Sequence, residues 1–304
     1  MSASGGNDEG RDLYIATLIA AERLARGMIS AGIDALAAAG AEPADWRWVE
    51  EGIAADIGFL HQPEAARAAL EAIDLAVDVV VQPAAGRAKA LLVADMDSTM
   101  ITVECIDELA DYAGIKAEVA QVTERAMRGE LDFEAALDAR VALLRDLDAG
   151  VIDRCYVERV RVMAGARELV GTMRAKGART VLVSGGFTVF ADRVAALIGF
   201  DRAVSNTLEI AEGRLAGTVA RPIVGAATKR ATLIAERDGL GLAPSATMAI
   251  GDGANDIPMI EAAGLGVAYR AKPKTAAAAA ARIDACDLTA LLYAQGYARR
   301  DWVV

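Results

Sequence analysis

The chain has 304 residues, of which 54% are hydrophobic, and a formal net charge of −11. This length allows two domains with a sizeable core, and the acidic excess argues against a nucleic-acid partner, because phosphate backbones attract clustered Lys and Arg. We also expect no membrane association, since no apolar run reaches the roughly 18 residues that span a bilayer and the first ten residues, which we expect to be disordered, lack the basic and apolar regions of a signal peptide.

Chemistry based on cysteine or histidine clusters is also disfavoured. Cys105, Cys155 and Cys286 are odd in number and widely spaced, and no C-x-x-C occurs, so neither a zinc site nor a disulfide framework is indicated. We expect them to be small core residues in a reducing compartment, which favours a cytoplasmic protein. The only histidine, His61, follows a predicted strand and is interpreted as a turn residue.

Residues 1–86 are predicted to form a separate N-terminal domain. Alternating apolar patterns and turn signals predict the order βαββαβ, which is typical of ferredoxin-like or ACT-like modules. No motif in this domain carries chemistry, and its expected role is dimerisation, amino-acid binding or stabilisation of the core. The predicted strands cover 13–19, 46–49, 53–60 and 75–81, and the predicted helices cover 24–39 and 63–73.

The next predicted strand ends in two acids. Leu91–Ala94 is apolar and is followed by Asp95 and Asp97. Residues two apart in an extended chain point the same way, so both carboxylates can face one site at the end of the strand. Buried neighbouring carboxylates need compensation, for which a divalent cation is suited, while one acid can act as nucleophile and the other as proton shuttle.

Residues 104–164 are predicted to be a helical insertion, with helices at 103–113, 117–128 and 133–144. A helical insertion directly after a catalytic strand is typical of a lid over the site. Strands and helices then alternate to the end of the chain, with 266–269 as the last core strand and a helix expected in the alanine run 276–281. This alternation predicts a Rossmann-like parallel sheet with right-handed crossovers.

Polar residues follow three further strands or begin the helices after them. Ser184 and Gly185 could hold a phosphoryl oxygen, Lys229 could neutralise carboxylates and phosphate, and Asp252 could bind a metal. Asn255 could donate to substrate oxygens, and Asp256 could orient Lys229 or a metal-bound water. Taken singly, each segment is also compatible with an ordinary turn, helix cap or solvated charge.

Together, in this order, the D-x-D-x-T motif, the serine, the lysine and the G-D-x-x-x-D motif resemble those of the haloacid dehalogenase superfamily of aspartate-nucleophile phosphatases. The resemblance implies an α/β core of residues 87–103 and 165–304, with residues 104–164 as a helical cap. In this superfamily the phosphatases keep the acid at the Asp97 position and the dehalogenases lack it, which favours phosphoryl transfer. The resemblance also implies Mg²⁺ as cofactor, held by Asp95, the backbone carbonyl of Asp97, and Asp252.

Within that superfamily the motifs look like those of the phosphoserine phosphatases. This resemblance implies hydrolysis of O-phospho-L-serine through an aspartyl-phosphate on Asp95, with Asp97 as general acid and base, as the last step of serine biosynthesis. It further implies that Glu104 takes the substrate ammonium and Arg140 its carboxylate, with Met127 and Phe133 packed around the substrate.

Three alternatives remain open at this point: a phosphotransferase that uses an alcohol as acceptor, a phosphatase of broader small-molecule specificity, and an amino-acid-sensing regulatory protein. The expected partner is a small molecule, with a possible homodimer formed through the N-terminal domain.

Overall fold

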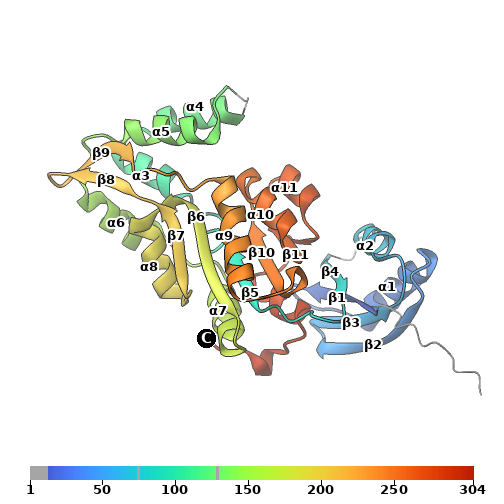
Figure 1. Ribbon diagram of the computed structural model, residues 1–304. Helices are drawn as coiled ribbons and strands as arrows, with labels where there is room; N and C mark the ends of the chain where they lie inside the picture. Colours follow the sequence, from blue (N-terminus) through green and yellow to red (C-terminus); the bar gives the residue numbers. More distant parts are fainter. Residues whose placement is uncertain (1–12, 74–75, 128–129) are drawn as a thin grey trace, which may run out of the picture.

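The computed structural model describes residues 13–73, 76–127 and 130–304, without the side chains of residues 126 and 127. The tail expected over the first ten residues lies outside these ranges. Within them, no helix is both long enough and apolar enough to span a bilayer. An N-terminal unit, a central α/β core and a group of helices follow one another across the molecule (Figure 1).

The N-terminal unit has the predicted order βαββαβ. Its antiparallel strands lie in the order β2-β3-β1-β4, which is the ferredoxin-like arrangement that the sequence predicts. Helix α2 begins at Pro63, whose fixed φ suits a first helical turn. The elements are β1 (Tyr14–Ala20), α1 (Arg26–Ala38), β2 (Pro43–Glu50), β3 (Ala54–Phe59), α2 (Pro63–Glu71) and β4 (Val77–Pro83).

The core is the predicted Rossmann-like sheet. Its strands lie in the order β12-β11-β10-β5-β6-β7, and all of their pairings are parallel. Helices α9 and α10 pack on one face, and α7, α8 and α12 on the other. The strands are β5 (Leu91–Ala94), β6 (Arg179–Phe187), β7 (Arg202–Asn206), β10 (Thr247–Gly251), β11 (Leu265–Tyr269) and β12 (Ala281–Ile283). The helices are α7 (Ala166–Ala175), α8 (Thr188–Ile198), α9 (Ala226–Gly239), α10 (Ile257–Ala262), α11 (Pro273–Ala278) and α12 (Ala290–Ala294), with short 3₁₀ turns η1 (Pro244–Ala246), η2 (Ala254–Asp256) and η3 (Arg299–Asp301).

The end of the alanine run differs from the sequence prediction. Helix α11 ends at Ala278, and Ala281 begins β12, so 266–269 is not the last strand of the core. Strand β12 pairs in parallel with β11 and antiparallel with β4. Pairing on both sides of a buried strand outweighs the helical preference of alanine, which is weak compared with tertiary contacts.

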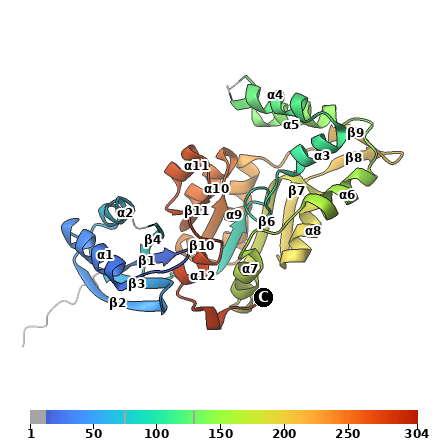
Figure 2. The same ribbon diagram turned by 180° about the vertical axis from the view of Figure 1, so that it is seen from behind.

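The N-terminal unit and the core share one continuous sheet, which the sequence does not indicate. Val79 of β4 pairs with Arg282 of β12, and Figure 2 shows the N-terminal unit lying directly beside the core. A buried ion pair crosses the seam between the two units: the Arg87 guanidinium donates to both oxygens of Asp56, at 2.6 and 2.9 Å, and to the carbonyl of Ala294. The N-terminal unit is therefore held against the core by backbone pairing and by a paired, buried charge.

In the described part of the chain, four helices and a β-hairpin form a cap above the carboxyl ends of the core strands (Figure 1). The hairpin lies within residues 165–304, which are expected to belong to the core, but it bonds to the cap instead. The backbone N–H groups of Asp146 and Ala149 donate to the carbonyls of Leu215 and Gly213 in the hairpin. The three cysteines are buried and free, as predicted. The cap elements are α3 (Cys105–Ala113), α4 (Lys116–Met127), α5 (Phe133–Leu143), α6 (Gly150–Arg159), β8 (Leu208–Ala211) and β9 (Arg214–Val219).

Candidate active site

Asp95 lies where β5 ends, in the centre of the parallel sheet. Its backbone N–H donates to the carbonyl of Ile250 on the neighbouring β10, which continues the sheet pairing by one residue. The side chain is 6% exposed, and one carboxylate oxygen, Oδ1, lies 2.5 Å from the ammonium of Lys229. The carboxylate is thus presented at the crevice beyond the strands, where ligands of parallel α/β sheets bind.

Lys229 is completely buried and has two acidic partners. It projects from the first turn of α9, and its Nζ lies 2.6 Å from Oδ1 of Asp256 as well as against Asp95. Burial lowers the pKa of this ammonium, but the two carboxylates outweigh that effect and hold its pKa above the ordinary value. Lys229 therefore stays charged and ties the end of β5 to the turn after β10.

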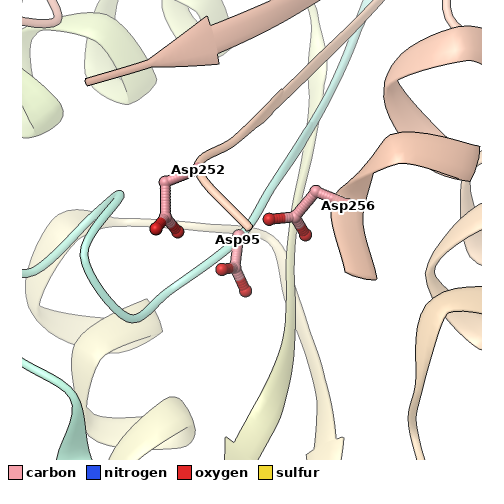
Figure 3. Close-up of side chains that lie close together, drawn as sticks. All are labelled: Asp95, Asp252 and Asp256. Carbon is pink, nitrogen blue, oxygen red and sulfur yellow. The ribbon is translucent and has the colours of Figure 1, made fainter. Parts of the chain in front are cut away.

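Three carboxylates converge at this point. Asp95, Asp252 and Asp256 each offer an oxygen, and these oxygens lie within 4.8 Å of one another (Figure 3). Both oxygens of Asp256 already accept hydrogen bonds, one from Lys229 and one from the Gly253 N–H. Among the described residues, the Asp252 side chain accepts a single hydrogen bond, at 3.4 Å from Thr99. Asp252 and Asp95 are therefore the more available ligands.

The negative charge of this cluster exceeds the positive charge that faces it. Burial, followed by repulsion from Asp256, raises the pKa of Asp95 well above its ordinary value and that of Asp252 to about 6. A buried set of carboxylate oxygens short of positive charge is the kind of donor set that hard divalent cations occupy. The residues present therefore fit a metal ion.

Asp97 lies just outside this cluster, at the N-terminus of cap helix α3. Its Oδ1 accepts a 3.3 Å hydrogen bond from the backbone N–H of Cys105. Burial and the nearby charge of Glu104 raise the pKa of Asp97 to about 7. A carboxyl group with this pKa can carry a proton at neutral pH, as a general acid must.

Glu104 and Arg140 face the same space from the cap. Ser98, whose φ is +56°, donates a 2.8 Å hydrogen bond to Glu104. Burial lowers the pKa of the Arg140 guanidinium, and Asp107, Glu104 and Asp97 all act on it as nearby negative charges. The cap therefore adds one negatively charged and one positively charged side chain to the side of the site opposite the core.

Ser184 lies inside β6, although the sequence predicts that it follows the strand. The strand runs on to Phe187, but its register against β7 shifts between Val183 and Phe187. Such a bulge turns backbone groups out of the ladder. The Gly186 N–H donates to Ser184 Oγ at 2.8 Å, and a Cβ on Gly186 would lie 2.9 Å from Asp97 Oδ2. The bulge thus brings the serine hydroxyl beside Asp97.

Phe133 of the cap packs over the core loops. If Gly185 carried a Cβ atom, that atom would lie 3.1 Å from the Phe133 ring and 3.8 Å from Nδ2 of Asn255. A Cβ atom on Gly225 would also lie 3.1 Å from the ring. The structure therefore brings together Phe133, Gly185 and Asn255, three residues that the sequence assigns to the same site. Met127 is the last residue of α4, and its side chain lies outside the described part of the structure.

Two contributors to the site were missed in the sequence. Ser98 orients Glu104, and Asn206, at the end of β7, binds the backbone of both Gly185 and Val224. Ser98 lies inside the D-x-D-x-T motif, and this position in the motif could have indicated a role in the site. For Asn206, the sequence offers no signal except a polar residue at the end of a strand.

Comparisons with known proteins agree with this geometry. The family model of the haloacid dehalogenase-like hydrolases matches residues 92–261. The phosphoserine phosphatase of Streptomyces coelicolor is 47% identical over 247 residues, which are 80% of this chain and 60% of that protein. The chain spans about six tenths of the length of the first curated relatives that it matches.

Solved structures show the same likeness. The structure of a probable phosphoserine phosphatase from Vibrio cholerae is 35% identical and has a TM-score of 0.76, covering 96% of this chain and 88% of that one. A phosphoserine phosphatase solved as a phospho-aspartyl intermediate analogue is 35% identical with a TM-score of 0.63, covering 68% of this chain and 98% of that one. The chain belongs to the haloacid dehalogenase-like hydrolases and, among them, to the phosphoserine phosphatase family.

Proposed function

We propose that this protein is a Mg²⁺-dependent phosphoserine phosphatase, which hydrolyses O-phospho-L-serine to L-serine and phosphate. The observation that carries this proposal is the position of Asp95, a buried carboxylate at the end of the central strand, held by Lys229 beside two further acids. The relative captured as a phospho-aspartyl intermediate analogue supports an aspartate nucleophile.

In the first step, an oxygen of Asp95 attacks the phosphorus, and the bond from phosphorus to the serine oxygen breaks. Asp97, with its raised pKa, gives its proton to the departing oxygen, which leaves as the hydroxyl of serine. A water molecule then attacks the aspartyl-phosphate and returns a proton to Asp97. Free phosphate leaves, and the Asp95 carboxylate is restored.

The phosphoryl group needs donors for its oxygens as charge shifts during both steps. The Ser184 hydroxyl, the Gly185 N–H and the Lys229 ammonium are the groups proposed to supply them. Ser184 suits this role because its oxygen already accepts from Gly186, so its own proton is available to another acceptor. Asn255, beside Gly185, adds a further amide.

Asp95 and Asp252 are the proposed side-chain ligands of the metal, together with the backbone carbonyl of Asp97. Asp256, whose oxygens are engaged by Lys229 and Gly253, is proposed to support the cluster without binding the ion directly. When bound, Mg²⁺ offsets the repulsion between the acids and an anionic phosphoryl group. Mg²⁺ is favoured because it binds carboxylates together with substrate phosphates.

The amino-acid end of the substrate is proposed to lie against the cap. Glu104 would pair with the ammonium of phosphoserine and Arg140 with its carboxylate, and the Phe133 ring would cover the substrate. Within the described residues, the Arg140 guanidinium forms no ion pair, and it donates to the Ala136 carbonyl at 3.3 Å. Its guanidinium is thus available to an anionic ligand.

We expect the purified protein to release phosphate from O-phospho-L-serine when Mg²⁺ is present, and to stop when EDTA removes the ion. Activity should return when excess Mg²⁺ is restored, because the acids remain in place. A malachite-green assay measures the phosphate. Undiminished release in EDTA would refute the metal assignment, and a complete lack of release with Mg²⁺ would refute the proposed function.

Replacing Arg140 by alanine should lower kcat/KM for phosphoserine by ~10²-fold, the value expected for a lost charge-assisted contact to a carboxylate. Hydrolysis of p-nitrophenyl phosphate, which has no carboxylate, should change by less than about threefold. Parallel steady-state assays of the two substrates measure the difference. Arg145, which lies beyond the end of α5, serves as the matched control when replaced by alanine. Equal losses for both substrates would show that Arg140 does not recognise the carboxylate.

A further inference from the structure

Asn206 occupies a junction that the proposed mechanism does not use. It is the last residue of β7, is 2% exposed, and lies opposite Phe187, at the point where the bulge of β6 ends. A buried amide retains its place only when its donors and acceptor are satisfied. The partners of Asn206 are therefore informative.

The amide of Asn206 binds two loops at once. Its Nδ2 donates to the carbonyl of Gly185 at 2.9 Å and to that of Val224 at 3.2 Å. Its Oδ1 accepts from the Val224 N–H at 2.7 Å. All three bonds go to backbone, so one side chain fixes the bulge of β6 and the segment that leads into α9.

On the β6 side, the bond to Gly185 fixes the orientation of a peptide plane. The carbonyl of Gly185 and the N–H of Gly186 belong to the same planar unit. Asn206 holds the carbonyl end, and the N–H end donates to Ser184 Oγ at 2.8 Å. In this orientation of the peptide plane, the Ser184 hydroxyl oxygen accepts the hydrogen bond from Gly186. The hydroxyl proton of Ser184 is then free to be donated to a ligand oxygen.

On the α9 side, Asn206 fixes the entry to the helix that carries the lysine. Val224 precedes Gly225, the N-cap residue of α9, and the Gly225 carbonyl accepts from the backbone N–H of Lys229 at 3.0 Å. The Phe133 ring rests on both Gly185 and Gly225. The two loops that Asn206 joins are thus also the two that meet the cap.

We propose that Asn206 is a positioning residue for phosphoryl binding, which sets the Ser184 hydroxyl, the Gly185 backbone and the start of the Lys229 helix in one fixed arrangement. This inference rests on the proposed phosphatase function. It assigns no contact between Asn206 and the substrate. Its effect on catalysis is expected through donors aimed at the phosphoryl oxygens, where small displacements are costly.

The test replaces Asn206 by aspartate, which keeps the shape and the acceptor for Val224 but removes both donors. Asn206→Ala, which places no charge beside the two carbonyls, is the second variant in case the first does not fold. Gln82→Glu is the matched control, because Gln82 is also a buried amide that donates to a backbone carbonyl, that of Ala294, but at the seam with the N-terminal unit.

Two measurements distinguish a positioning role of Asn206 from a general destabilisation of the core. In thermal unfolding, Mg²⁺ alone should raise the Tm of the Asn206→Asp protein as much as that of the wild type, because the acid cluster is untouched. Inorganic phosphate added with Mg²⁺ should raise the wild-type Tm further and that of the variant much less. In steady-state assays, kcat should fall by ~10²-fold for both phosphoserine and p-nitrophenyl phosphate, whereas Gln82→Glu should leave both values within about twofold of the wild type.

The proposal is overturned if phosphate stabilises the Asn206 variants as strongly as the wild type. It is equally overturned if the Mg²⁺ stabilisation is lost together with the phosphate effect, since Asn206 would then support the whole core rather than the phosphoryl site. If the wild type does not hydrolyse phosphoserine, the proposed function fails, but the phosphate-dependent Tm shift still decides the role of Asn206.

Discussion

Replacing Asp95 by asparagine should abolish phosphoserine hydrolysis, with a fall in kcat of ~10⁴-fold or more, because the amide cannot form the acyl phosphate. Asparagine keeps the size of the side chain and the backbone bond to Ile250, so the fold should survive. The residual rate is measured by phosphate release. Mass spectrometry of acid-quenched protein should show a phosphorylated species for the wild type and none for the variant.

The matched control for this experiment is Asp201→Asn. Asp201 accepts from the N–H and hydroxyl of Thr180 and from Arg174 at the other end of the β6 strand. Its replacement removes a negative charge from a hydrogen-bonded aspartate without touching the site, and activity should stay within about twofold. Turnover by Asp95→Asn within tenfold of the wild type, or a phosphorylated variant, would show that another group is the nucleophile.

The order of elements could be predicted from the sequence because the local signals agree with the fold. The apolar run 91–94, the glycine after α3 and Pro63 at the start of α2 each indicate the boundary that the structure shows. Such signals depend on backbone conformations and burial within one element, and both are visible in a single sequence. They also predict the parallel core, because alternating strands and helices have few other ways to pack.

The errors involve pairings between distant segments. Strand β12 has three residues and begins at the last of six consecutive alanines, so only its neighbours β11 and β4 make it a strand. The continuous sheet and the Arg87–Asp56 ion pair join segments that the sequence assigns to two separate domains. Local patterns carry no information about such partners, and one sequence offers no other source.

The candidate site shows the same division. Asp95, Lys229, Asp252 and Asp256 were grouped because each follows a strand of a parallel sheet or begins the next helix, and the carboxyl ends of these strands lie together. The bulge of β6 could not be predicted, because it depends on the register against β7. Asn206 was missed for the same reason, since its importance comes from which two carbonyls lie within reach of its amide.

Replacing Lys229 by methionine should lower kcat by ~10³-fold and also destabilise the fold. Methionine fills a similar volume, but it leaves the carboxylates of Asp95 and Asp256 buried without the ammonium that lies 2.5 and 2.6 Å from them. Removing one partner of a buried ion pair costs about 3–5 kcal/mol. Urea unfolding in EDTA measures the stability, and phosphate release with Mg²⁺ measures kcat.

A double variant separates the two consequences. Adding Asp256→Asn to Lys229→Met removes one of the two uncompensated charges, and the new amide can donate to the Asp95 carboxylate that faces the same space. Stability should then recover by about half of the loss, within the range of ~1–3 kcal/mol for a satisfied buried group. Activity should stay as low as in the single variant, because no ammonium at position 229 faces the phosphoryl oxygens. Recovery of activity together with stability would mean that Lys229 serves only to balance the buried acids and takes no part in phosphoryl transfer.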